Sequence, residues 1–303
     1  METCHMKRRK KIAGIFLIAV FAIAAFFHSP SVEAKQEIKI SQKNHKCRVW
    51  AVSESNARYG KNAVTAGTEY YKEFLVDNVF HSKNNGDIHY NVYFPDSYDG
   101  KSKHALYITL PGYQGLYFQG VAENIKTEDF GFEAQKYNSE MVILAPQLND
   151  WEETSADQAI ALVEYFLSHY RIDPTKVYIN GYSGGGETLS IVLGKRPELF
   201  TAALMCSSQW DGTYQPVVSA KTPVYFVIGE DDEYYGSQPF RNAYKKLYEL
   251  YKKQGLSEKQ IKDLLVLDVK DSSYFAGTGI AYQHGGGYLF CRDAEIMGWL
   301  FSK

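Results

Sequence analysis

From about residue 105 onward, short apolar runs alternate with longer segments that carry apolar residues at helical spacing, as Leu162, Val163 and Phe166 do. The short runs predict strands, and the longer segments predict helices. The predicted strands are Ala105–Leu110, Met141–Ala145, Val177–Asn180, Ala202–Cys206, Val224–Ile228 and Leu264–Val269. The predicted helices are Ser155–His169, Glu187–Leu193, Phe240–Gln254 and Ala294–Phe301. This alternation predicts an α/β fold, with a mostly parallel sheet joined by right-handed crossovers and with helices on both faces.

Ahead of this region, the pattern is aromatic and turn-rich. Tyr70–Phe80 and Asp87–Phe94 read as strands, and the Asn85-Gly86 pair between them favours a tight hairpin turn. We therefore expect antiparallel strands at the N-terminal edge of the sheet. Residues 35–69 are polar and weakly patterned, so we interpret them as an N-terminal extension and residues 70–303 as the main folded domain.

The first residues have the pattern of an export signal. A basic cluster, Lys7–Lys11, precedes the segment Ile12–Phe27, which contains no charged residue. The small residues Val32 and Ala34 suit cleavage before Lys35. We expect residues 1–34 to be a signal peptide and the mature protein to be secreted or held at the extracellular face of the envelope. The alternative is that this segment is an uncleaved membrane anchor. We expect the protein to contact the membrane only if this alternative holds.

Composition narrows the functional classes. The chain is 45% hydrophobic and 22% charged, which is typical of a folded protein. The net charge of -2 and the lack of a long basic stripe exclude a protein built to bind nucleic acid. Beyond the signal segment only Cys47, Cys206 and Cys291 remain, an odd number without a CxxC pair, which argues against a disulfide framework and a zinc knuckle. A single bridge stays open, although Cys206 and Cys291 lie in apolar stretches and are expected in the core.

The candidate chemistry centres on Ser183. It is the serine of a G-x-S-x-G sequence, Gly181 to Gly185, directly after a predicted strand and before a predicted helix. That context is typical of a nucleophile elbow, in which a sharp turn exposes the serine hydroxyl. The alternative interpretation is a glycine-rich turn with an idle serine.

A serine hydroxyl needs a base and an orienting acid, which follow it in the order acid, then histidine, in this kind of fold. His284 is the only histidine after Ser183, and it lies between the last strand and the last helix. Four carboxylates follow the strand that ends near Gly229. We select Asp232 as the acid and keep Asp231 as the alternative, while the other two are expected to be solvated.

The remaining site residues are predicted from strand ends. Backbone N–H groups of Gly184, after the nucleophile, and Tyr113, after an earlier strand, are expected to form the oxyanion hole. We expect Tyr182, Trp210 and Tyr235 to contact substrate, because loops gather over an active site where strands end. Aromatic residues that merely fill core or surface positions are the competing interpretation.

These motifs resemble the α/β-hydrolase superfamily, and within it the secreted bacterial esterases that are prolyl-oligopeptidase-like or similar to feruloyl esterases and polyhydroxybutyrate depolymerases. The resemblance covers about residues 70–303 and is carried by Pro111-Gly112, Arg171 to Pro174 before Val177–Gly186, Gly229 to Asp232, and His284 before Trp299 to Phe301. In two departures from the family pattern, Pro111 replaces a usual histidine and Gly184 a bulkier residue, so a looser oxyanion hole is expected.

The resemblance implies acyl transfer to water through an acyl-serine, with a Ser-His-Asp triad and without a metal or cofactor. The resulting hypothesis is a secreted carboxylic-ester hydrolase acting on a small-molecule or polymer-linked ester. A serine peptidase of prolyl-oligopeptidase-like type and a catalytically silent binding protein on the same fold are the alternatives.

Overall fold

The computed structural model describes residues 63–303. The predicted signal peptide, Cys47 and most of the predicted extension lie outside the described residues. Within residues 63–303, no helix is both long enough and apolar enough to cross a bilayer.

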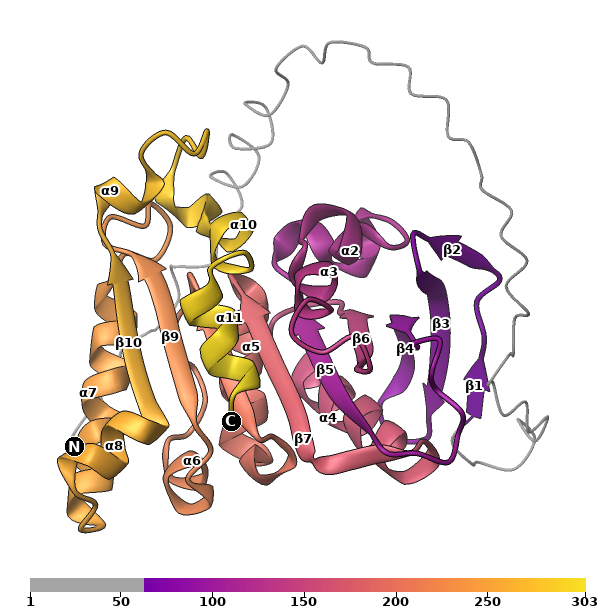
Figure 1. The fold of residues 1–303 in the computed structure, drawn as a ribbon, viewed down its shortest axis with the longest axis horizontal. Helices are drawn as coiled ribbons and strands as arrows, with labels where there is room; N and C mark the ends of the chain where they lie inside the picture. Colours follow the sequence, from indigo (N-terminus) through magenta and orange to yellow (C-terminus); the bar gives the residue numbers. More distant parts are fainter. Residues whose placement is uncertain (1–62) are drawn as a thin grey trace, which may run out of the picture. The chain divides into compact units, whose positions relative to one another are not determined.

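One sheet organises this part of the chain (Figure 1). Its strands are β1 (Ala63–Thr65), β2 (Glu69–Tyr71), β3 (Phe74–Ser82), β4 (Gly86–Tyr93), β5 (His104–Leu110), β6 (Val142–Gln147), β7 (Ile172–Tyr182), β8 (Ala202–Cys206), β9 (Val224–Gly229) and β10 (Leu265–Lys270). The order across the sheet is β1-β3-β4-β6-β5-β7-β8-β9-β10, with β2 paired to β3.

The strand directions divide the sheet in two. From β6 through β5, β7, β8 and β9 to β10 all pairs are parallel. The first four strands pair antiparallel, and β4 runs antiparallel to β6. The predicted fold class, a mostly parallel sheet with antiparallel N-terminal edge strands, is confirmed. In parallel strands the carboxyl ends share one edge, so the loops after β5, β7, β9 and β10 gather there.

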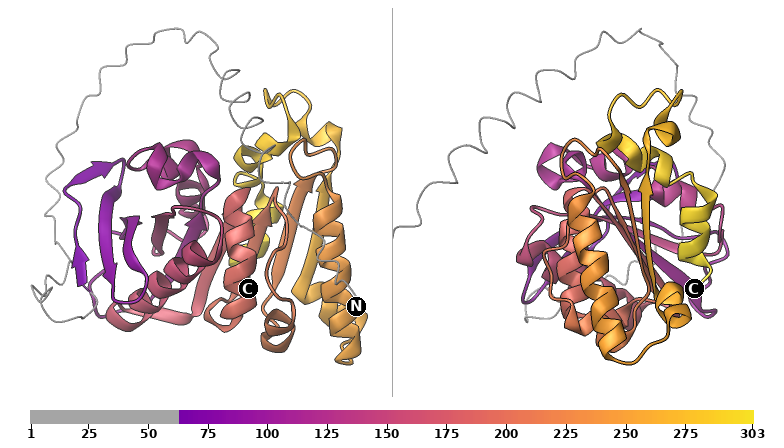
Figure 2. Two further views of the ribbon diagram at one scale, coloured as in Figure 1. Left: turned by 180° about the vertical axis from the view of Figure 1, so that it is seen from behind. Right: turned by 90° about the vertical axis from the view of Figure 1, so that its left-hand side faces the viewer.

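Helices cover both faces of the sheet, as expected (Figures 1 and 2). The α-helices are α2 (Glu123–Thr127), α3 (Phe130–Ala134), α4 (Glu153–His169), α5 (Gly184–Lys195), α6 (Gln215–Ala220), α7 (Gln238–Lys253), α8 (Glu258–Leu264), α9 (Ser272–Phe275), α10 (Gly287–Phe290) and α11 (Ala294–Phe301). The 3₁₀ helices are η1 (Tyr113–Gly115), η2 (Tyr117–Gln119), η3 (Pro197–Leu199) and η4 (Gln283–Gly286).

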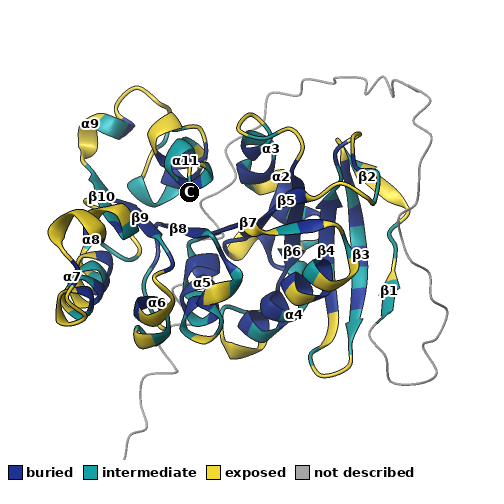
Figure 3. Cartoon of the chain, turned by 60° about the horizontal axis from the view of Figure 1, so that its bottom comes forward, coloured by how far each residue is buried: buried dark blue, intermediate teal, exposed yellow. Residues whose placement is uncertain are grey.

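The core consists of two layers, one on each face of the sheet. Alternate residues of β5 show the division, because Leu106 and Ile108 share a core layer with residues of α4, α5 and α7, whereas Ala105 and Tyr107 share the other layer with residues of α3 and α11. Figure 3 shows the central strands buried and the outer helix surfaces and loops exposed. Both faces of the parallel strands are thus covered, which explains their nearly continuous apolar runs.

Several predicted boundaries were wrong for local reasons. Tyr70–Phe80 is two strands, because Lys72 adopts a φ of 51° in a turn that carries no glycine to mark it. The strand predicted at Val177 begins at Ile172, and the helix predicted at Glu187 begins at Gly184, because a run of glycines conceals its first turn. Residues 63–65 of the predicted extension pair with β3. Cys206 and Cys291 are free and buried, as expected of core residues.

Candidate active site

Ser183 occupies a strained turn between β7 and α5. Its φ of 54° and ψ of -126° lie outside the regions that ordinary residues prefer. The turn closes only around glycines: a Cβ on Gly181 would lie 2.3 Å from the Gly185 carbonyl oxygen, and one on Gly185 2.3 Å from that of Leu110. The backbone is held by a 3.0 Å bond from the Ser183 N–H to the Cys206 carbonyl. The G-x-S-x-G spacing is therefore a packing requirement of this turn.

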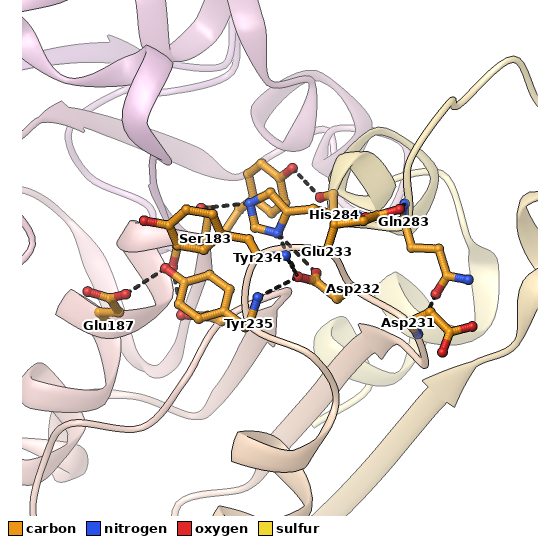
Figure 4. Close-up of polar contacts among 11 residues, drawn as sticks. Ser183, Glu187, Asp231, Asp232, Glu233, Tyr234, Tyr235, Gln283 and His284 are labelled. Carbon is orange, nitrogen blue, oxygen red and sulfur yellow. Dashed lines mark hydrogen bonds and ion pairs between the residues drawn. The ribbon is translucent and has the colours of Figure 1, made fainter. Parts of the chain in front are cut away.

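The structure brings the three predicted triad side chains into one hydrogen-bonded row (Figure 4). Ser183 Oγ lies 3.0 Å from His284 Nε2, and His284 Nδ1 lies 3.0 and 3.1 Å from the two carboxylate oxygens of Asp232. A carboxylate can only accept, so the shared proton lies on Nδ1 and Nε2 is free to accept the serine proton. The row has the geometry required to activate a serine hydroxyl.

The Asp232 side chain is fully buried, yet its charge is well supported. The backbone N–H groups of Tyr234 and Tyr235 donate to Oδ1 at 3.0 and 2.9 Å. Burial alone would raise the pKa of this carboxyl, but the hydrogen bond and charge of His284 and the two N–H groups together lower the pKa below its ordinary value of 3.8. Since its folded-state pKa is lowered, Asp232 stabilises the fold above the ordinary pKa, and that stabilisation is lost as the pH falls through the folded-state value.

Two neighbouring acids make different contacts. Asp231 is exposed, and its backbone N–H donates to the side chain of Gln283 at 2.8 Å. Glu233 is exposed too, but its carboxylate accepts the backbone N–H groups of Gln283 and His284, each at 3.0 Å. Glu233 thus anchors the histidine loop, which the sequence did not indicate because the two segments meet only in the folded chain.

Tyr113 and Gly184, the residues predicted to form the oxyanion hole, both follow strand ends near Ser183. Each is the first residue of a helical turn, η1 and α5 respectively, where a backbone N–H has no acceptor within its own turn. A Cβ on Gly112 would lie 3.3 Å from the Ser183 Cβ, so the loop that carries Tyr113 packs directly against the serine. An anion at this point would face the positive end of the α5 dipole.

Trp151 occupies the space beside Gly184. A Cβ on Gly184 would lie 2.3 Å from Trp151 Nε1 and 2.4 Å from two carbons of the indole. The ring also packs on Tyr113, with the centroids 5.8 Å apart. Its buried Nε1–H has no hydrogen-bond partner among the described residues. The small residue at 184 is therefore matched by a large one from the loop after β6, a pairing that the expectation of a looser hole did not include.

The three predicted substrate-contact residues occupy different environments. The Tyr182 hydroxyl donates to the backbone carbonyl of His284 at 2.6 Å, which ties the histidine loop to β7. The Tyr235 hydroxyl donates to Glu187, and its ring centre lies 5.6 Å from that of His284. Burial raises the pKa of Glu187. Trp210 stacks on Tyr214 at 5.2 Å, and its indole N–H bonds within its own loop. Tyr182 and Tyr235 thus contact His284, whereas the contacts of Trp210 are with its own loop and the core.

Comparisons with known proteins agree with this architecture. The model of the prolyl oligopeptidase family matches residues 147–254, a segment that contains Ser183 and Asp232. An acetylxylan esterase of Coprinopsis cinerea is 35% identical over 63 residues, which are 21% of this chain and 16% of that protein.

Two solved structures extend the comparison to the fold. The structure of a thermostable esterase aligns with a TM-score of 0.61 and 23% identity, covering 76% of this chain and 63% of its own. Oligopeptidase B from Leishmania major aligns with a TM-score of 0.51 and 13% identity, over 76% of this chain and 36% of its own. The chain therefore spans less than two thirds of the length of each of these relatives, and at such identities the likeness concerns the fold.

Proposed function

Since this chain has the α/β-hydrolase fold, we propose that it is a secreted serine hydrolase that cleaves carboxylic esters through an acyl-serine intermediate. The observation that carries the proposal is the row from Ser183 through His284 to Asp232, at 3.0 Å for each step. The family match and the esterase relatives support a serine hydrolase of esterase or prolyl-oligopeptidase type. Secretion is supported by the sequence pattern of residues 1–34.

The reaction begins with proton transfer from Ser183 Oγ to His284 Nε2 as the oxygen attacks the ester carbonyl carbon. Asp232 stays ionised and stabilises the imidazolium that results. The tetrahedral intermediate collapses when Nε2 returns the proton to the leaving alcohol oxygen. Water, deprotonated by the same nitrogen, then attacks the acyl carbon. The second tetrahedral intermediate collapses as Nε2 returns that proton to Ser183 Oγ, which releases the acid and regenerates the serine.

The negative charge that develops on the carbonyl oxygen needs donors already in place. In the proposal, the N–H groups of Tyr113 and Gly184 supply them, because both begin helical turns beside Ser183. Such preorganised donors are worth about 3 kcal/mol each in comparable sites. Trp151 packs against Tyr113 and lies beside Gly184.

The choice between an ester and an amide depends on the leaving group. An amine leaves only after protonation, whereas an alcohol leaves more readily, so the row of three groups suffices for esters. The acetylxylan esterase favours an acetyl ester on a polysaccharide, and the prolyl oligopeptidase match keeps peptides as the second candidate. Rates on p-nitrophenyl acetate and acetylated xylan, set against those on aminoacyl anilides, separate the two.

The covalent step predicts that a fluorophosphonate probe labels the wild-type protein and not Ser183→Ala, because the probe reacts with an activated serine hydroxyl. In-gel detection of the probe, with ester turnover measured in parallel, checks this. Ser219→Ala, which removes an exposed serine on α6, is the matched control and should label fully. Labelling that persists in Ser183→Ala would place the nucleophile elsewhere and contradict the proposal. A folded wild type that is not labelled would contradict it too and favour a silent binding protein.

A further inference from the structure

A buried carboxyl group, that of Glu128, lies behind the oxyanion loop. Glu128 follows α2 directly, and although the residue as a whole is half-buried, its Oε2 exposes less than 1 Å² and has no hydrogen-bond partner among the described residues. Its Oε1 accepts the backbone N–H of Gly112 at 2.7 Å. The site of a Cβ on Gly112 would lie 3.4 Å from this oxygen and 3.3 Å from the Ser183 Cβ. Gly112 thus lies between the Glu128 carboxyl group and Ser183 in space.

The bond from Gly112 bears on the direction of the Tyr113 N–H. The Gly112 carbonyl oxygen accepts the Gly115 N–H at 3.1 Å, so the plane of the Gly112–Tyr113 peptide is held from one side. A trans peptide is planar, so the Tyr113 N–H points away from that carbonyl. Glu128 holds the preceding plane through the Gly112 N–H. Glycine rotates easily about both bonds, and therefore this position depends on being held on both sides.

The segment that carries Glu128 is itself rigidly attached to the sheet. Asn124 of α2 donates to the Ala145 carbonyl at 2.7 Å and accepts from the Asn91 side chain at 2.6 Å. A Cβ on Gly115 would lie 2.8 Å from the Asn124 Cα, so α2 and η1 are in tight contact. A buried polar network with its partners in place fixes one geometry. The segment that precedes Glu128 is therefore held in one position relative to the sheet and to Gly112.

We propose that Glu128 is a positioning residue of the oxyanion loop, whose carboxyl group orients the Gly112 amide and through it the Tyr113 N–H. The inference rests on the proposed function, because it assigns Tyr113 to the oxyanion hole. Glu128 acts through Gly112 and does not touch the substrate. A carboxyl group suits this position in its neutral form, because it offers an acceptor without placing a negative charge beside the developing oxyanion.

The charge state of Glu128 then matters for the reaction. Burial raises the pKa of Glu128 from 4.5 to about 8, although the Gly112 hydrogen bond opposes this. Above that pH the enclosed carboxyl becomes negative and repels the charge of the tetrahedral intermediate. Activity should consequently fall as the pH rises through about 8.

The titratable groups around Glu128 do not offset this change. The buried groups that interact with it electrostatically include Tyr107 of β5, Tyr182 of β7, Cys206 of β8 and Cys291 after α10. Burial raises the pKa of each, in Cys291 to about 12, so all of them are neutral near pH 8. The adjacent Asp129 is paired with Arg292, which also contacts Glu133.

Two variants separate positioning from charge. Glu128→Gln keeps an acceptor for the Gly112 N–H but cannot ionise, so its turnover near pH 7 should stay within about twofold of the wild type. Its activity should be level from about pH 7 to about pH 10, where the wild type loses about tenfold. Glu128→Leu removes the acceptor and should lower kcat by about 10- to 100-fold with KM little changed.

The measurements are pH profiles of kcat and KM on one p-nitrophenyl ester, with Glu123→Gln and Glu123→Leu as controls. Glu123 is an acid of α2 that pairs with Lys126 on the surface, and its removal should leave both constants as they are. Full kcat in a folded Glu128→Leu, or an alkaline decline in Glu128→Gln equal to that of the wild type, overturns the inference. Fluorophosphonate labelling of the wild type tests the proposed function separately, since it depends on Ser183 and not on the pH profile.

Discussion

At the scale of single residues, burial distinguishes four adjacent acids that look alike in the sequence. Glu230, Asp231 and Glu233 are exposed, whereas the Asp232 carboxylate is enclosed and paired with His284. The difference arises in the turn after β9, where the Asp232 N–H bonds back to the Gly229 carbonyl at 3.2 Å. The alternative acid, Asp231, has its side chain on the outside of this turn. A one-residue change of register would exchange the two.

Replacing Asp232 with Asn should therefore abolish most activity. The amide removes the charge that stabilises the imidazolium and allows the wrong tautomer of His284, so kcat should fall by about 10⁴-fold while KM changes little. Steady-state kinetics on one ester at one pH measure this. Asp231→Asn is the matched control and should retain most activity. An inactive Asp231→Asn beside an active Asp232→Asn would reverse the assignment of the acid.

Glu233 is a second residue whose role follows from its contacts, and its expected contribution to stability is small. Its carboxylate holds two backbone N–H groups of the histidine loop rather than the imidazole itself. The contact is exposed, and exposed hydrogen bonds contribute little to stability. Its importance lies in where it places His284, a role that the residue type alone does not reveal.

At the scale of elements, the site is assembled where strands end and helical turns begin. Ser183 lies between the end of β7 and the start of α5. Gly112 lies between the end of β5 and η1, and Tyr113 is the first residue of η1. The loop after β6 adds Trp151, whose indole covers Gly184. The first N–H groups of α5 and η1 are unpaired within their turns and so can serve as donors. The change from strand to helical turn therefore leaves the N–H groups that can bind an anion.

The contact between this loop and α5 predicts that Gly184→Ala lowers activity. The new methyl group would lie 2.3 Å from Trp151 Nε1, so either the indole or the start of α5 must shift. A displacement of this kind should lower kcat/KM by about 10- to 100-fold.

The matched control is Gly298→Ala in α11, where a Cβ would approach nothing closer than Tyr137 at 3.9 Å. It should keep full activity, because alanine is the better helix former. Kinetics on the same ester, with melting temperatures for folding, compare the two variants. An unaffected Gly184→Ala would show that the indole moves aside freely and that the loop does not shape the oxyanion hole.

At the scale of the whole molecule, the parallel strands place the candidate triad residues close together, and the antiparallel strands extend one edge of the sheet. Ser183, Asp232 and His284 lie about 50 residues apart from one to the next, at separations of 49 and 52. They meet because β7, β9 and β10 are parallel and present their following loops at one edge. Residues 1–34 are the part of the chain expected to direct export.

The protein made in its native host should begin at Lys35 or close to it and be found outside the cytoplasmic membrane. The small residues Val32 and Ala34 before this position are the expected recognition signal for cleavage. N-terminal sequencing of the protein from culture medium and from membranes checks the prediction. Recovery of the intact basic cluster from the membrane fraction would instead show an uncleaved anchor.

Much of the fold was predictable from the sequence, because apolar periodicity reports directly on strands and helices. Ala202–Cys206 and Ala294–Phe301 have the predicted bounds, and the order of elements predicts the parallel sheet. The turn at Lys72 and the glycine-rich first turn of α5 escaped prediction, since local conformation there departs from what the residue types favour.

The sequence alone determined the candidate chemistry, because the glycines around Ser183 are required by a turn that only they can make, and because His284 is the only histidine that follows. Tertiary structure alone decided which carboxylate faces His284, that Trp151 fills the space beside Gly184, and that Glu128 reaches the Gly112 amide. The physical reason is range: a turn depends on neighbours in the chain, whereas burial, pairing and pKa depend on groups that only folding brings into contact.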